Sequence, residues 1–151
     1  MKGALGFVTL ACQRDEGGNL MFAPAEFLYN LCCFLGFVAR FYRNDGYRGD
    51  CLLKVALDIP ATARVVESKK TPSLLNTRRL FTDPLHIVAK GSYSWVGNIN
   101  LHGHGFGEQL LNTVDEVMLA IARKNGNLLS STFRDEVQPI VNDVLACVTS
   151  S

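Results

Sequence analysis

The sequence contains little charge, and neither sign is in large excess. Of its 151 residues, 19% are Asp, Glu, Lys or Arg, and the formal net charge is +1. A chain with this balance has no general attraction to nucleic acid, because that attraction depends on basic side chains that neutralise phosphates. Hydrophobic residues make up 48% of the chain. This content excludes a disordered chain and predicts a globular domain with a substantial core.

The sequence also lacks an apolar run of membrane-spanning length. In the apolar stretch of residues 24–43, the uncharged run covers only residues 27–39. A membrane-spanning helix needs roughly 20 apolar residues, and Asn30 interrupts this run. We therefore expect no membrane span and no membrane partner.

Recognisable metal and disulfide patterns are missing as well. The chain has five cysteines, an odd number, and no two of them are spaced as Cys-x-x-Cys. This predicts reduced, structural thiols in a cytoplasmic protein. His102 and His104 flank a glycine, but a zinc site needs further ligands that cannot be identified here. We expect neither a metal nor a cofactor.

No frame for catalysis by a nucleophile is present. A hydrolase needs a nucleophile, a base and an orienting group. The sequence contains no Gly-x-Ser-x-Gly or comparable motif that would hold them together. We therefore assign no catalytic residue.

Residues 24–43, PAEFLYNLCCFLGFVARFYR, have the periodicity of a long helix with two apolar stripes. Pro24 suits the first helical position, and Glu26 places negative charge near the positive end of the helix dipole. The first stripe contains Phe27, Asn30, Phe34, Phe37 and Phe41, and the second contains Leu28, Leu31, Leu35, Val38 and Tyr42. Two adjacent stripes make an apolar face wider than one sheet usually covers. The segment is therefore either a central core helix or a core helix that also presents its four phenylalanines to a second subunit or domain.

The remaining segments indicate several strands and two more helices. Residues 51–59 are the most regular strand, because apolar side chains alternate along it. Other strands are predicted for residues 4–12, 20–22 and 61–67, with candidates at 80–81 and 86–89 and a strand or long loop at 92–100. We expect residues 61–67 to pair with 51–59 as a hairpin, and the long helix to lie across this sheet.

Two helices are predicted near the C-terminus, one covering residues 106–124 and one with a core face that begins at Phe133. Pro139 either kinks this last helix or marks its true start. The order of strands and helices predicts a single α+β domain over residues 1–151. Its expected architecture is a two-layer sandwich, with a mostly antiparallel sheet, one long apolar helix and two C-terminal helices.

The segment LHGHGFGEQ, residues 101–109, places three glycines at alternate positions before a helix. Such a loop lets backbone N–H groups surround an anion at the positive end of the helix. The candidate anion-binding residues are His102, Gly103, His104, Gly105, Gly107 and Glu108. The loop and its helix resemble the pyrophosphate-binding loop of GCN5-type acetyltransferases, with His102 in place of that family's Gln or Arg. The resemblance implies an acyltransferase-like enzyme that binds phosphate or CoA; the alternative is a glycine-rich turn before a helix.

Arg40, Arg43 and Arg48 lie near two tyrosines, Tyr42 and Tyr47, at the end of the long predicted helix. Groups of this kind can contact the phosphates of a nucleic acid. Basic residues at a helix C-terminus also interact favourably with the helix dipole while they stay solvated. We prefer this second interpretation, because the rest of the chain is not strongly basic.

The helix end FYRNDGYRG, the strand CLLKVAL and the closing pair of helices resemble the accessory region that follows Schlafen/AlbA-type DNA-binding domains in bacterial proteins. This resemblance implies that the chain is part of a larger regulator. With the wide apolar helix face, it predicts a non-catalytic binding or oligomerisation module of a cytoplasmic regulatory protein. The expected partner is a second copy of the chain or another protein, and the acyltransferase-like enzyme is the alternative.

Overall fold

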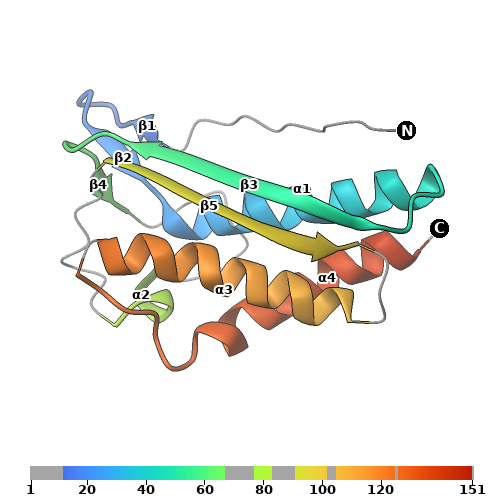
Figure 1. Cartoon of the computed structure of the whole chain (residues 1–151). Coiled ribbons are helices and arrows are strands. Elements are labelled where there is room, and N and C mark those ends of the chain that lie inside the picture. The colour runs from blue at the N-terminus through green and yellow to red at the C-terminus, as the bar shows by residue number, and fades with distance from the viewer. Residues whose placement is uncertain (1–11, 67–76, 83–90, 102–104, 125, 151) are drawn as a thin grey trace.

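The structure, a computed structural model, describes residues 12–66, 77–82, 91–101, 105–124 and 126–150. Side chains are described for all of these residues except Thr77 and Arg78. The elements are β1 (Cys12–Arg14), β2 (Leu20–Phe22), α1 (Pro24–Asn44), β3 (Asp50–Ile59), β4 (Arg64–Val65), α2 (Thr77–Leu80), β5 (Gly91–Asn100), α3 (Phe106–Lys124) and α4 (Phe133–Thr149). Three long helices combine with short and long strands, which confirms the predicted α+β fold (Figure 1).

The strands form two small sheets where we had expected one. β1, β2 and β4 form the first sheet, and β3 pairs with β5 in the second. The predicted hairpin of residues 61–67 with 51–59 is wrong, because β4 pairs in parallel with β2. Pro60 has no N–H to continue a ladder, and the N–H of Ala63 bonds the Pro60 carbonyl at 2.9 Å. This turn directs the chain away from β3.

β3 and β5 form an antiparallel ribbon of ten paired residues each, from Asp50 opposite Asn100 to Ile59 opposite Gly91. The alternation predicted for β3 is confirmed, since Leu57 and Ile59 are buried whereas Leu52, on the opposite face, is 73% exposed. Residues 92–100 belong to a strand and not to a long loop.

The candidate strand at residues 80–81 is not a strand in the structure. Leu80 is the last residue of α2, and Phe81 makes only an isolated bridge to Leu129. Both Leu80 and Phe81 are buried, so they do not alternate between a buried and a solvated face as strand neighbours do. The predicted strand at 86–89 and residues 4–11 of the first predicted strand lie outside the described residues.

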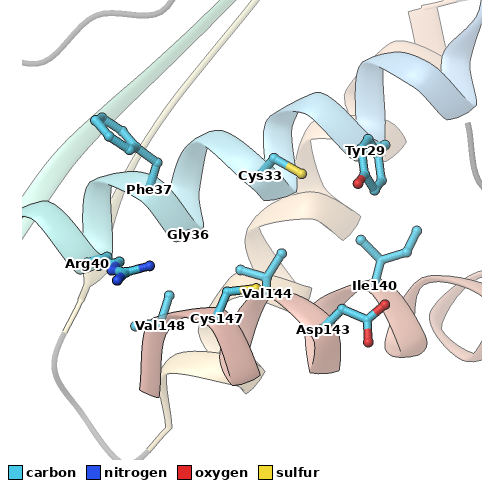
Figure 2. A pocket seen from close by; sticks show the side chains of 10 residues that line it. All are labelled: Tyr29, Cys33, Gly36, Phe37, Arg40, Ile140, Asp143, Val144, Cys147 and Val148. Carbon is cyan, nitrogen blue, oxygen red and sulfur yellow. The ribbon is translucent and has the colours of Figure 1, made fainter. Parts of the chain in front are cut away.

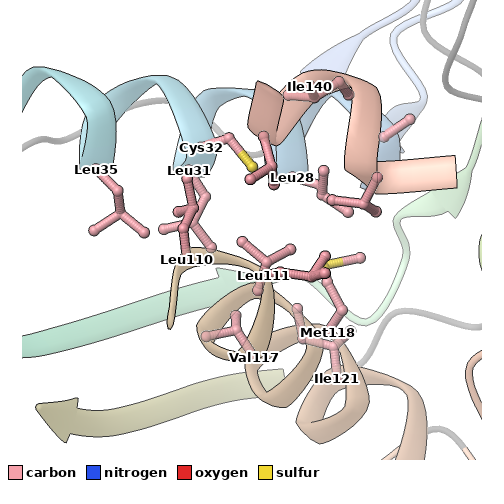
Figure 3. Close-up of a cluster of buried hydrophobic side chains, with 14 of the residues drawn as sticks. Leu28, Leu31, Cys32, Leu35, Leu110, Leu111, Val117, Met118, Ile121 and Ile140 are labelled. Carbon is pink, nitrogen blue, oxygen red and sulfur yellow. The ribbon is translucent and has the colours of Figure 1, made fainter. Parts of the chain in front are cut away.

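The long helices pack mainly on one another and on the ribbon. α1 packs against α4 and α3, and α3 packs against β5. Buried side chains of α1, β3 and β5 belong to one hydrophobic cluster, and the expectation that α1 lies across the sheet containing β3 stays a prediction. In the core, Leu28, Leu31 and Leu35 of α1 point toward Leu110 and Leu111 of α3 (Figure 3). Buried side chains from all three long helices and both sheets belong to one cluster.

The inward and outward faces of β3 provide a test of the fold. We expect Leu57→Asp to lower the free energy of unfolding by about 3 kcal/mol or more, because it places a charge in the core without a partner. Leu57 is 6% exposed. Leu52→Asp is the matched control, since the same change on the exposed face should have little effect. Urea denaturation followed by circular dichroism measures both, and equal stability of the two variants would contradict the observed facing of the strand.

Candidate functional site: a groove between α1 and α4

α1 and α4 approach each other closely at a glycine. A Cβ atom at Gly36 would lie 2.5 Å from Cγ1 of Val144, closer than real Cβ contacts allow. Glycine is therefore required here by packing, although it weakens a helix interior by about 1 kcal/mol relative to alanine. Because the helix backbones are close at this point, side chains on both sides of it line a groove.

The groove has a volume of about 340 Å³ and runs between the outward sides of α1 and α4 (Figure 2). We call it the α1–α4 groove. Its lining residues are Tyr29, Cys33, Gly36, Phe37 and Arg40 from α1, and Ile140, Asp143, Val144, Cys147 and Val148 from α4. Its volume lies within the usual range for binding sites, roughly 300–1,000 Å³.

The four phenylalanines of α1 do not form one exposed stripe. Phe27 packs against Phe22, with ring centroids 6.2 Å apart, and Phe27 and Phe34 both pack on the hydrophobic core. In contrast, Phe37 is 59% exposed and Phe41 is 45% exposed, and their ring centroids are 6.3 Å apart. The apolar surface that remains for a partner is therefore the Phe37–Phe41 half of α1, next to the groove.

Polar groups of the groove include Tyr29 and two exposed thiols, Cys33 and Cys147. A hydrogen bond to Cys33 raises the pKa of Tyr29, and the negative charges of nearby groups, including Asp143, add to this effect. The Tyr29 hydroxyl therefore stays protonated at neutral pH and acts as a hydrogen-bond donor.

The three arginines of the predicted phosphate-contacting cluster lie in three different environments. Arg40 lines the groove, whereas Nη1 of Arg43 donates a hydrogen bond of 3.3 Å to the Val148 carbonyl near the end of α4. Arg48 is exposed beyond the end of α1. From the sequence we preferred solvated arginines at the end of their own helix, whereas Arg43 is partly buried and bonds a carbonyl near the end of the neighbouring helix α4.

The glycine-rich loop is only partly described. His102, Gly103 and His104 lie outside the described residues. Gly107 lies in the first turn of α3, where a Cβ would be 2.7 Å from Cδ1 of Leu145, so this glycine permits close packing of α3 on α4. Glu108 pairs with Arg134 at 3.5 Å, and its carboxylate occupies the first turn, where it would repel an anion. Anion binding stays a prediction that the described part of this loop does not favour.

Sequence reasoning missed the contribution of α4 to the groove. Asp143, Val144 and Cys147 lie on the side of α4 that faces the outer part of α1 (Figure 2). Gly36 was the available signal, because a glycine inside a strongly apolar helix often indicates close packing against a neighbour. Which neighbour this is cannot be read from local sequence.

The fold and site define an α+β chain with an open groove between two helices. Across the described ranges, no three His, Cys, Asp or Glu residues are grouped to hold a metal ion. Likewise, no helix in the described part of the chain is long and apolar enough to cross a membrane. Comparisons with known protein families, curated proteins and solved structures find no significant match to this chain.

The first prediction for the site concerns the stability that the close contact of α1 and α4 at Gly36 provides. We expect Gly36→Ala to lower the free energy of unfolding by about 1–3 kcal/mol, because the added methyl group overpacks against Val144. Gly105→Ala is the control, since nothing lies within 4 Å of its added Cβ. Adding Val144→Ala to Gly36→Ala should make the double variant more stable than the two single losses predict. A stable Gly36→Ala protein in thermal denaturation would argue against this contact.

A second prediction concerns the different reactivity of the thiols in α1 and α4. Burial, with a smaller effect of Cys33, raises the pKa of Cys32 to about 12, so at neutral pH this thiol carries almost none of its reactive thiolate form. Cys33 and Cys147 are exposed. We expect iodoacetamide to modify these two well before Cys32, as measured by tandem mass spectrometry after digestion. Protein unfolded in urea is the control, in which all three should react at similar rates; equal rates in the native protein would contradict the buried position of Cys32.

Proposed function

We propose that this chain is a non-catalytic docking module of a cytoplasmic regulatory protein. Its α1–α4 groove, with the adjoining Phe37 and Phe41, binds another polypeptide, which is a second copy of the chain or a partner protein. The observation that carries the proposal is the exposure of these two aromatic rings beside an apolar groove. Contiguous exposed apolar surface is uncommon on soluble monomers and marks interaction sites.

The composition of the groove supports a polypeptide as the occupant. Gly36, Val144 and Val148 make part of its lining apolar, and two aromatic residues, Tyr29 and Phe37, and one arginine, Arg40, line it as well. Protein interfaces have the same arrangement, an apolar centre with a polar rim, and they are enriched in aromatic residues and arginine. A groove between two helices also suits the apolar face of a third helix, a common mode of peptide recognition.

The chemical state of the cysteines supports a reducing compartment. All five are free in the structure, and free thiols are typical of cytoplasmic proteins. Two of them, Cys33 and Cys147, line the groove and are exposed. In an oxidising compartment, exposed thiols of this kind would be open to disulfide exchange.

A peptide-binding experiment tests the proposal. A displayed library of amphipathic helical peptides, with apolar residues at positions i, i+3, i+4 and i+7, is selected against the protein, and the Kd of selected peptides is measured by fluorescence polarisation at low protein concentration. We expect Phe37→Ser to raise the Kd at least tenfold, because truncating an aromatic side chain that anchors an interface commonly costs about 2 kcal/mol.

Val96→Ser is the matched control. Val96 is 56% exposed, close to the 59% of Phe37, but it lies on β5 away from the groove. Its replacement should leave the Kd unchanged. Failure to select any peptide with a Kd below about 1 mM, a weak affinity near −4 kcal/mol, would overturn the proposal. Equal losses in the two variants would overturn it too, because binding would then not depend on the groove.

A further inference from the structure

We infer that the polypeptide bound in the α1–α4 groove is a second copy of this chain, and that the two copies are related by a two-fold axis. This inference rests on the proposed docking function and names its partner. It is carried by two opposite charges that stand at opposite ends of one apolar groove.

Arg40 and Asp143 are the charged side chains that line the groove. Figure 2 shows Arg40 at one end, beside Val148, and Asp143 at the other end, beside Ile140. Both are exposed. In the described part of the chain, neither forms an ion pair or a hydrogen bond. Each is therefore available to a charge that comes from outside the chain.

Two-fold symmetry brings these charges together. In such an interface both copies use the same surface patch, and one patch is turned by half a rotation relative to the other. The Arg40 end of one groove then meets the Asp143 end of the other, and the reverse contact forms at the same time. A single kind of ion pair is thus made twice, and complementary charges of this kind select one orientation of two partners over others.

The centre of the groove suits the same arrangement. Between the two charges lie Gly36, Val144 and the thiols of Cys33 and Cys147 (Figure 2). These groups are small or apolar, so the centre of the interface would be free of charge, as is usual for buried interface centres. Phe37 lies toward the Arg40 end and adds aromatic surface that the second copy would cover.

Charge reversal tests the pairing. Arg40→Glu places two carboxylates opposite each other at both contacts, and Asp143→Arg places two guanidinium groups opposite each other. Each variant alone should therefore dissociate at least ten times more readily than the parent. An equimolar mixture of the two variants should associate again, because a mixed dimer joins opposite charges at both of its contacts. Sedimentation velocity over about 1 to 300 µM covers the affinity expected of a small interface.

Two controls accompany the measurement. Circular dichroism establishes that both variants are folded, as expected for changes at exposed positions. Lys54→Glu makes the same change in net charge as Arg40→Glu, on an exposed residue of β3, and should leave association unaltered. Loss of association in Lys54→Glu as well would assign the effect to net charge and overturn the pairing.

The outcomes separate this inference from the function on which it rests. A parent chain that stays monomeric at the highest concentration, or a mixture that does not regain association, would overturn the second copy as partner. If peptides still bind in a way that depends on Phe37, the docking function stands without it. If peptide binding fails as well, both proposals fall.

Discussion

The close contact of α4 with Gly36 of α1 is the constraint on which the arrangement of these two helices depends. A Cβ at Gly36 would lie 2.5 Å from Cγ1 of Val144, a stiff β-branched side chain, so it would push α4 outward. Gly107 of α3 faces the next residue, Leu145, where an added Cβ would meet the end of a flexible side chain. With α4 held close to both helices, the three share one core, and the outer sides of α1 and α4 form a groove.

α1 serves the core and the surface at once because its apolar residues extend around most of the helix. Leu28 and Leu35 are buried in the core, whereas Phe37 points outward next to the groove. A groove built on two packed helices has a firmly positioned floor, since its residues belong to elements whose geometry is set by the core. Binding to such a surface requires little ordering of the protein, which lowers the entropic cost of association.

The charged side chains of α1, α3 and α4 include some that have a partner within the chain and others that line the groove without one. Arg43 bonds a carbonyl near the end of α4, and Glu108 pairs with Arg134. The bond of Arg43 places a positive charge near the negative end of α4, which is favourable, whereas the exposed pair of Glu108 and Arg134 contributes little to stability. Arg40 and Asp143 stand along the groove without an ion-pair partner in the described part of the chain, which is why we connect them, and not the other charges, with recognition.

Local sequence determined the helix of residues 24–44, the alternation along β3 and the helix that follows residue 105, because periodicity, proline and glycine signals act over a few neighbouring residues. Tertiary structure decided three other features: the pairing of β4 with β2, the separation of exposed Phe37 from packed Phe27, and the use of Gly107 to admit Leu145. Each of these depends on a partner distant in sequence. A stripe of apolar residues shows which side of a helix avoids water, but only packing determines how much of that stripe the rest of the chain can cover.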